Sequence, residues 1–214
     1  SKGLGGSMHM SDKNNFNPGS SAVVASGVAL AAGLSFALKH KKQENIAVAL
    51  LGDGATNRGV VHEIMNISSI WDLPLLYLLE NNGYGMSSSV KQMVAGNNLT
   101  DRAKVFNIKA ISVDGNDFEQ VYNAIYHARK YIIEENKPFL IECKTYRYNG
   151  HSKSDPCIYR TREEESYWLS RCPIKNFTKK LIDNKIATKE EIDILNKACE
   201  KLVLEELNKA EAVK

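Results

Sequence analysis

Two short runs of apolar residues, separated by a stretch of helical length, constrain the fold of this chain more than any other feature. The first run spans Ile46 to Leu51 and is followed by Gly52. The second run spans Pro74 to Leu79 and is followed by Glu80. Continuous apolar runs of this length are typical of strands that are buried on both faces of a parallel sheet. The residues from about Asn57 to Trp71 have the length of the helix that a parallel crossover requires. The pair therefore predicts a strand–helix–strand unit.

The same alternation continues on both sides of this unit. We expect a helix from Ser20 to about Leu38, because small and apolar residues occupy all its faces, as in a buried helix. After a loop rich in Gly, Ser and Asn over 83–101, strands are expected at 110–113 and 138–144, with a helix from Asp117 to about Glu135 between them. Alternating strands and helices of these lengths predict an α/β fold with a doubly wound, mostly parallel sheet.

The character of the sequence changes after the last expected strand. Residues 145–160 are polar and form a long loop. Thr161 and Thr188, each followed three residues later by Glu, predict the starts of two helices. We therefore expect an α/β domain over residues 1–160, which includes this loop, and a C-terminal helical extension over residues 161–214.

Composition argues against several classes of protein. The 214 residues carry a net charge of +3 with dispersed basic residues, which gives no indication of nucleic-acid binding. No apolar stretch approaches the roughly 20 residues that a membrane span needs. The cysteines, Cys143, Cys157, Cys172 and Cys199, show no paired spacing, which favours a reduced intracellular protein. We therefore expect a cytoplasmic location. The chain starts with neither an initiator Met nor a signal peptide, so targeting cannot be read from it and an organelle stays open.

Polar residues follow directly on both apolar runs. Asp53, within Gly52-Asp53-Gly54, ends the first run, and Asn82, within Asn81-Asn82, ends the second. Ligands of open α/β sheets bind beyond the carboxyl ends of the strands, so both side chains should lie in one crevice. A carboxylate and an amide oxygen suit a hard cation such as Mg²⁺, which proteins usually bind together with a phosphate group.

A phosphate group would also find a suitable backbone here. The flanking glycines, Gly52 and Gly54, would let the backbone approach a diphosphate closely, and the helix expected near Asn57 would direct its N-terminus at the anion. Taken alone, G-D-G also marks ordinary turns. The sequence contains neither a P-loop nor G-x-G-x-x-G, so the phosphate must be held mainly through the metal.

Further motifs give this pattern a family resemblance. G-D-G followed by N-N after the next strand is the thiamine-diphosphate motif. It is accompanied by Gly5-Gly6-Ser7-Met8-His9-Met10, E-N-N-G-Y-G-M at 80–86, Val113-Asp114-Gly115 and Y-R-Y-N-G-H-S-K-S-D at 146–155. Over essentially its whole length the chain resembles the alpha subunit of the decarboxylating first component of 2-oxo acid dehydrogenase complexes, of the pyruvate or acetoin dehydrogenase type. Alpha subunits of this family extend further in both directions, so the resemblance implies truncation at both ends.

The resemblance implies a role for individual residues. Asp53 and Asn82 would supply ligands to Mg²⁺, and the backbone carbonyl of Tyr84 would supply a third. Gly54 and Ala55 would lie against the diphosphate, and Val24 would touch the aminopyrimidine end of the cofactor. The full set expected to contact thiamine diphosphate is Val24, Gly52, Asp53, Gly54, Ala55, Asn82, Tyr84 and His151.

His151 falls on the histidine of the family's active-site loop, so it is the expected catalytic residue. A histidine suits this role because the side chain, as a residue type, can pair with phosphate when charged or pass a proton. The alternative is a solvated loop histidine. Ser152 matches a position that is phosphorylated in mitochondrial relatives, and a phosphate there would add negative charge beside those of the cofactor.

Several arginines surround this loop. Arg147, Arg160 and Arg162 either fix the loop through Asp155 or Glu163, or are simply solvated. We expect them to order the loop.

The implied activity is that of a thiamine-diphosphate-dependent oxidoreductase. It cleaves or decarboxylates a small 2-oxo compound, pyruvate or acetoin, and transfers the acyl group to a lipoyl carrier; Asn149 and Lys153 lean towards acetoin. In the family the glutamate that activates the aminopyrimidine comes from a beta subunit. The chain is therefore expected to be incomplete alone and to work with a beta subunit, in a heterotetramer of two alpha and two beta subunits, and with a lipoyl-bearing acyltransferase.

Two other interpretations stay open. A transketolase-like transferase would keep G-D-G and N-N but would not need the loop sequence at 146–155. A non-catalytic fragment could bind the cofactor or serve assembly without turnover.

Overall fold

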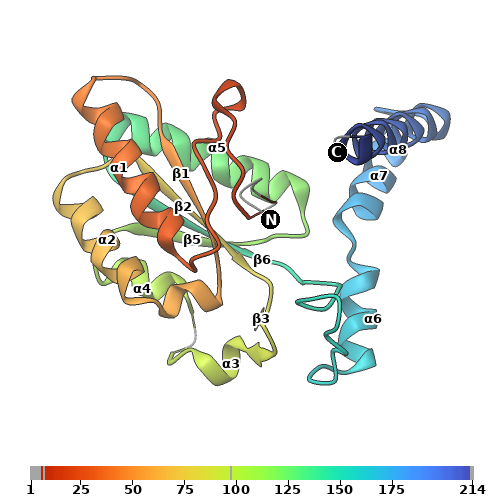
Figure 1. The fold of residues 1–214 in the computed structure, drawn as a ribbon, viewed down its shortest axis with the longest axis horizontal. Helices are drawn as coiled ribbons and strands as arrows, with labels where there is room; N and C mark the ends of the chain where they lie inside the picture. The colour runs from red at the N-terminus through yellow and green to blue at the C-terminus, as the bar shows by residue number, and fades with distance from the viewer. Residues whose placement is uncertain (1–5, 7, 97, 213–214) are drawn as a thin grey trace. The chain divides into compact units, whose positions relative to one another are not determined.

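The computed structural model describes residues 6, 8–96 and 98–212 of the chain (Figure 1). Gly5 and Ser7 of the N-terminal motif lie outside the described residues. The chain divides into two compact units, one that runs to Leu169 and one that begins at Ser170. Within the described ranges, no helix has both the length and the apolar character that crossing a membrane demands.

The first unit is built on a sheet of four parallel strands. These are β1 (Ala47–Gly52), β2 (Leu75–Asn81), β5 (Lys109–Asp114) and β6 (Phe139–Lys144), in the order β1-β2-β6-β5. All three strand pairs are parallel. The predicted strands are therefore confirmed to within two residues at each end.

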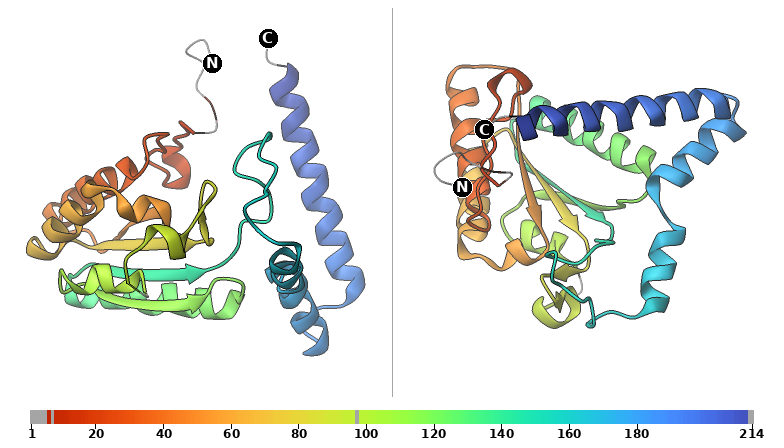
Figure 2. Two further views of the ribbon diagram at one scale, coloured as in Figure 1. Left: turned by 90° about the horizontal axis from the view of Figure 1, so that it is seen from below. Right: turned by 45° about the vertical axis from the view of Figure 1, so that its right-hand side comes forward.

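Helices cover both faces of this sheet. The long helices α1 (Ser26–His40) and α2 (Gly59–Ile70) and the short α4 (Thr100–Lys104) share one apolar core with one face of the strands. Helix α5 (Phe118–Glu135) packs on the opposite face through Ala124, Ala128 and Ile132. Figure 1 and the left view of Figure 2 show α1 and α2 on one side of the strands and α5 on the other. The predicted α/β class is confirmed.

Strand β1 differs from the expectation of a strand buried on both faces. It alternates between buried and exposed residues, and Val48 and Leu50 are 47% and 66% exposed. β1 lies at one edge of the sheet, while α5 packs on strands β2, β5 and β6. A continuous apolar run identifies a strand correctly, but its position in the sheet decides whether both faces are covered.

Two helices begin later than expected. Helix α1 begins at Ser26 rather than Ser20, because Ala25 has a left-handed backbone with φ of 69°, which a right-handed helix cannot include. Helix α2 begins at Gly59. The 3₁₀ helix η2 (Gly54–Asn57) precedes it, and extended Arg58 separates the two. The element that directly follows Asp53 is therefore the 3₁₀ helix.

The segment expected as a loop over 83–101 has its own structure. It contains a two-stranded antiparallel hairpin of β3 (Tyr84–Gly85) and β4 (Ser88–Ser89), followed by α3 (Val90–Met93) and the start of α4. A further short 3₁₀ helix, η1 (Lys13–Asn15), lies near the N-terminus.

The later helices follow their predicted start signals. Helix α6 (Arg162–Ser170) begins after Thr161, whose hydroxyl accepts a hydrogen bond from Glu164 N at 3.2 Å. Helix α8 (Lys189–Ala212) begins after Thr188. The backbone N–H of Thr188 donates to the side chain of Glu191, and the backbone N–H of Glu191 donates to the hydroxyl of Thr188. Helix α7 (Pro173–Asp183), with proline in its first turn, lies within the expected helical extension, although its start was not assigned from the sequence.

Candidate functional site

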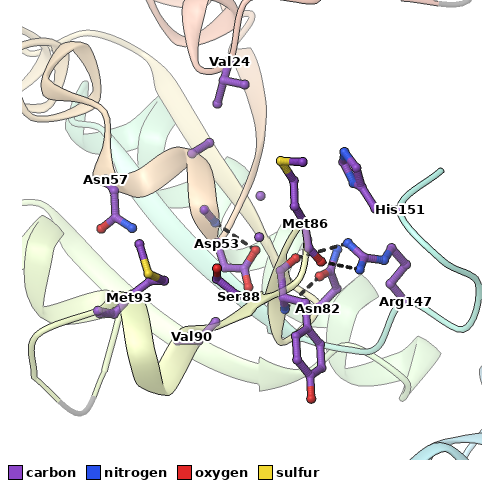
Figure 3. A pocket seen from close by; sticks show the side chains of 16 residues that line it. Val24, Asp53, Asn57, Asn82, Met86, Ser88, Val90, Met93, Arg147 and His151 are labelled. Atoms are coloured by element: carbon purple, nitrogen blue, oxygen red, sulfur yellow. Dashed lines mark hydrogen bonds between the residues drawn. The ribbon is translucent and has the colours of Figure 1, made fainter. Parts of the chain in front are cut away.

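A pocket of about 540 Å³ opens beyond the carboxyl ends of β1 and β2 (Figure 3). All the residues expected to contact the cofactor line it: Val24, Gly52, Asp53, Gly54, Ala55, Asn82, Tyr84 and His151. Figure 3 shows Asp53 and Asn82 in the middle of the pocket, Val24 on one side and His151 on another. Residues from four separate segments of the chain thus meet at one place.

The strand register explains why Asp53 and Asn82 meet. β1 and β2 are parallel, and Gly52 pairs with Glu80. The chain therefore leaves both strands at the same edge, and the residues that follow lie side by side. The juxtaposition inferred from spacing alone is the arrangement that the structure has.

Asp53 is the most buried polar group of this pocket, at 2% exposed. Its Oδ1 accepts a hydrogen bond from Gly54 N at 2.8 Å, whereas Oδ2 is buried and has no hydrogen-bond partner among the described residues. Burial raises the pKa of this carboxyl, although the Gly54 amide and the charge of Arg147 oppose the rise. Burying a carboxylate oxygen without a partner costs free energy, and a bound cation would offset this cost.

Asn82 and Tyr84, which line the same pocket as Asp53, offer further oxygen atoms. The side-chain oxygen of Asn82 accepts a hydrogen bond from Tyr84 N at 3.2 Å, and the carbonyl of Tyr84 accepts one from Arg147 Nη1 at 3.3 Å. Carboxylate, amide and carbonyl oxygens are the donors that Mg²⁺ and Ca²⁺ use. Across the described ranges no cluster of three or more His, Cys, Asp or Glu could hold a metal. A cation here would therefore depend on one carboxylate and neutral oxygens, and the donor set fits Mg²⁺.

The residue next to Asn82 is anchored in the sheet. Asn81 donates from Nδ2 to Glu142 Oε1 at 2.7 Å and accepts from Gly83 N at 3.2 Å. Its carbonyl accepts from Thr145 N at 2.9 Å. Buried Glu142 thus fixes the turn that carries Asn82. Sequence reasoning missed Glu142, although a single acidic residue inside the apolar strand at 138–144 was a signal.

Two glycines allow the segments after β1 and β2 to touch. A Cβ on Gly54 would lie 3.2 Å from Gly85 Cα, and a Cβ on Gly85 would lie 3.3 Å from Gly54 Cα. Side chains at either position would push η2 away from the β3–β4 hairpin. Glycine is therefore required after Asp53 partly because of this contact within the protein. The approach of a phosphate would be a separate reason.

The loop that carries His151 is held by Asp155. This carboxylate accepts hydrogen bonds from His151 N at 2.7 Å, Cys157 N at 3.0 Å and Tyr159 Oη at 2.7 Å. The bonds from Cys157 and His151 lower the pKa of Asp155 most, to about 2. A Cβ on Gly150 would lie 2.8 Å from Asp155 Cβ, so the turn requires glycine there.

Arg147 and Arg160 order the loop, mainly through backbone carbonyls. Arg147 donates to Met86 O and to Tyr159 Oη, at 2.7 and 2.8 Å. Arg160 donates to Arg147 O at 2.5 Å and Tyr148 O at 2.7 Å. Its Nε forms an ion pair with Glu165 at 2.8 Å. The direct contacts of these arginines are thus with backbone carbonyls, the Tyr159 hydroxyl, Cys157 Sγ and Glu165, and Asp155 is linked to Arg147 through Tyr159.

One wall of the pocket is apolar and was not foreseen. Val90, Met93 and Val94, within and after α3, line it together with Met86. Figure 3 places Met93 and Asn57 opposite Arg147 and His151. The spacing of Val90, Met93 and Val94 is that of one helix face, a signal within a segment otherwise typical of a loop. The pocket thus combines a polar floor with an apolar wall, as small-molecule sites do.

The chain matches known proteins over its whole length. Residues 1–214 match the family described as "Dehydrogenase E1 component". The chain is 40% identical over 205 residues to "Pyruvate dehydrogenase E1 component subunit alpha" of Rickettsia felis, which covers 96% of this chain and 63% of that protein. It is 42% identical over 212 residues to the mitochondrial protein of the same description from Dictyostelium discoideum, which covers 98% of this chain and 54% of that protein.

The alignments cover nearly all of this chain but only part of each relative. The chain spans about three-fifths of the length of the Rickettsia felis protein and about half of the Dictyostelium discoideum protein. A match over residues 1–214, together with identities of 40% and more, leaves no doubt about descent. This chain belongs to the dehydrogenase E1 component family.

Proposed function

We propose that this chain is the alpha subunit of a thiamine-diphosphate- and Mg²⁺-dependent 2-oxo acid dehydrogenase component that acts on pyruvate. The observation that carries the proposal is the buried Oδ2 of Asp53, which has no hydrogen-bond partner among the described residues and belongs to a pocket that Asn82 and Tyr84 also line. Similarity to proteins described as pyruvate dehydrogenase alpha subunits supports pyruvate rather than acetoin as the substrate.

In this proposal neighbouring residues of the pocket would hold the metal and the diphosphate. Asp53, Asn82 and the carbonyl of Tyr84 would hold Mg²⁺, and Gly52, Gly54 and Ala55 would contact the diphosphate. Val24, on the far side of the pocket in Figure 3, contacts the aminopyrimidine end. The apolar wall beside α3 supports this assignment, because a pocket for a cofactor with ring systems needs apolar surface as well as polar groups.

The cofactor supplies an electron sink for the cleavage of a carbon–carbon bond next to a carbonyl group. This chain contributes by binding and orienting the cofactor and by exchanging protons. His151 lies at the rim of the pocket, on a turn fixed by Asp155, and we assign it the catalytic role of holding or passing a proton during acyl transfer. Arg147 keeps the loop against the β3–β4 hairpin through Met86 and the carbonyl of Tyr84.

Completion of the active site requires partners. No residue of this chain is assigned the activation of the aminopyrimidine, so we propose that a beta subunit supplies a glutamate and that two alpha and two beta subunits form the enzyme. The acyl group passes to a lipoyl-bearing acyltransferase. Within the chain we propose a cofactor-binding domain over residues 1–160 and a helical extension over 161–214.

The substitution Asp53→Asn tests the metal assignment. It keeps the shape of the side chain but removes the charge, so we expect Mg²⁺-dependent binding of thiamine diphosphate to weaken by about 100-fold or more, since the cation loses the carboxylate that lines its pocket. Binding is measured by calorimetry on the complex with the beta subunit. Asp193→Asn, the same change on the exposed surface of α8, is the control and should bind like the unsubstituted protein. Equal binding in the two variants would contradict the assignment.

The substrate is tested on the same complex. An artificial electron acceptor is used to measure turnover, and the turnover of pyruvate is compared with that of acetoin. Pyruvate should be preferred. Preference for acetoin would refute that part of the proposal, and absence of thiamine-diphosphate binding would refute it as a whole.

A further inference from the structure

The 3₁₀ helix η2, which directly follows Asp53, is held from outside the pocket by an arginine distant in sequence. Arg102, on the short helix α4, donates from Nη1 to Thr56 Oγ1 at 2.6 Å and from Nη2 to Asn57 Oδ1 at 2.7 Å. One planar guanidinium thus bridges two consecutive residues of η2 with two separate N–H groups. Such a fork fixes orientation as well as position, which a single hydrogen bond does not.

The contact with Thr56 reaches Asp53 itself. Thr56 is buried, and its hydroxyl donates to the carbonyl of Asp53 at 2.6 Å while it accepts from Arg102. The amide of Thr56 donates to the same carbonyl at 3.2 Å. The hydroxyl of Thr56 can donate to Asp53 without competition because Arg102 offers only donors. Arg102 therefore sets the direction of the hydroxyl that clamps the backbone of Asp53.

The contact with Asn57 reaches the pocket. Asn57 lines the pocket at the end of η2, and Figure 3 shows its side chain on the side opposite His151. Arg102 does not line the pocket; it contacts two residues of η2, one of which does. Its influence on a bound ligand must pass through η2.

The charge of Arg102 has no carboxylate partner in the part of the chain that the structure describes. Among the residues that the structure describes, no Asp or Glu lies within ion-pair distance of its guanidinium, which is half-buried. Burial lowers the pKa of this group from its usual value, although arginine remains charged at neutral pH. A partly desolvated cation paired only with neutral oxygens leaves positive potential behind η2, and this potential would favour an anion bound on the pocket side of η2.

We propose that Arg102 is a positioning residue for the anion-binding turn, which holds Asp53, Gly54 and Asn57 in the geometry that receives the diphosphate and its metal. The identity of the anion as a diphosphate rests on the proposed function. The positioning of the turn does not, because the hydrogen bonds from Arg102 to Thr56 and Asn57 are made within the chain itself. Preorganisation of this kind reduces the cost of ordering the site on binding.

Two variants of Arg102 and one control variant test this role. Arg102→Gln removes the charge and the fork, and Arg102→Lys keeps the charge but can reach one acceptor at a time. Lys104→Gln removes the other basic residue of α4, whose ammonium bonds Asp101 at 2.8 Å and does not contact η2. The control therefore separates the loss of a positive charge on α4 from the loss of the two contacts.

The first measurement is hydrogen exchange of the ligand-free protein, followed in peptides that cover residues 53–58. The amides of Thr56 and Arg58 donate to carbonyls within this turn. Arg102→Gln should raise their exchange rate by about tenfold, which is the effect of losing about 1.4 kcal/mol of local stability. Lys104→Gln should leave it unchanged. Exchange in Arg102→Gln equal to that of the control would overturn the proposal.

The second measurement is the dissociation constant of thiamine diphosphate at saturating Mg²⁺, on the complex with the beta subunit. Two lost hydrogen bonds from a charged donor correspond to about 10- to 100-fold weaker binding in Arg102→Gln. Arg102→Lys should lie between Arg102→Gln and the unsubstituted protein. At saturating cofactor kcat should return to that of the unsubstituted enzyme, because the residue positions the turn rather than taking part in the reaction. Unchanged affinity in Arg102→Gln, or a kcat that does not recover, would overturn the proposal.

The two measurements distinguish this inference from the proposed function. If the unsubstituted protein does not bind thiamine diphosphate, the proposed function fails, while exchange still decides the role of Arg102. If Arg102→Gln does not fold, Asn57→Ala removes one of the two acceptors and tests the same link by exchange. Faster exchange over residues 53–58 in that variant supports the link, and unchanged exchange overturns it.

Discussion

At the scale of single residues, burial separates cysteines that can react from cysteines that cannot. Cys143 lies in β6 at 7% exposed, and burial, followed by the charges of Glu80 and Glu142, raises its pKa to about 11. Because the thiolate is the reactive form, Cys143 should react with iodoacetamide at pH 8 at least about a hundredfold more slowly than exposed Cys199. Mass spectrometry of the labelled protein measures the two rates.

Denaturant provides the control for this comparison. In the unfolded chain the two thiols should be labelled at similar rates, because the environment that separates them is lost. Similar rates in the native protein would contradict the buried position of Cys143.

Asp155 gives the His151 loop a predictable response to acid. Its pKa is lowered to about 2, whereas the unfolded chain has the ordinary value of 3.8. A lowered pKa stabilises the folded loop above the unfolded value, and this contribution disappears as pH falls from about 4 towards 2. Hydrogen exchange of peptides over 150–159, corrected for the intrinsic rate at each pH, should therefore show protection at pH 5 that declines below pH 4.

The variant Asp155→Asn supplies the contrast. It lacks the titrating carboxylate, so its loop should be less protected at pH 5 and should change little between pH 5 and pH 2.5. A loop with the same acid response in both proteins would mean that another group controls it.

At the scale of the elements, α5 shows how one cap stabilises a helix. Asp117 Oδ1 accepts from Glu119 N at 3.0 Å and from Gln120 N at 3.1 Å, and Gln120 Nε2 donates back to Asp117 Oδ2 at 3.0 Å. Asp117→Ala leaves these amides without a side-chain acceptor, so it should lower the free energy of unfolding by about 1 kcal/mol. Urea unfolding monitored by circular dichroism measures the change.

Asp117→Asn is the matched variant for this cap. Asparagine caps helices about as well as aspartate, so its stability should lie close to that of the unsubstituted protein. Equal losses in the two variants would show that the charge of Asp117, and not its hydrogen bonds, stabilises α5.

At the scale of the whole molecule, binding at the pocket should stabilise the fold that carries it. A ligand that binds only the native state adds about 2.7 kcal/mol at a concentration of 100 Kd, which for a protein of this size raises Tm by about 5–10 °C. Thiamine diphosphate with Mg²⁺ should produce this shift in a thermal scan of the complex with the beta subunit. EDTA should reverse it, because the proposed site holds the diphosphate mainly through the metal.

The Asp53→Asn variant gives the reference for this scan. Its Tm should not respond to thiamine diphosphate and Mg²⁺ at the same concentrations. A shift that survives EDTA would contradict the dependence of binding on the metal.

The sequence by itself determined the frame of the molecule and the centre of its pocket. Apolar runs and capping residues act through neighbours along the chain, so the strands and the start of α5 could be predicted closely. The meeting of Asp53 and Asn82 was also predictable, since parallel strands bring their carboxyl ends to one edge and Gly52 pairs with Glu80. This arrangement is common to all parallel sheets, so it can be predicted without knowing the contacts of this particular protein.

Only the tertiary structure decided how the pocket is supported. The approach of Gly54 to Gly85, the bond from Asn81 to Glu142 and the bridge from Arg102 to η2 each join residues that are distant in sequence. No local pattern specifies such partners, because they depend on where α4, the β3–β4 hairpin and β6 pack against one another. Local interactions therefore positioned Asp53 and Asn82 at the ends of their strands, and long-range packing fixed their surroundings.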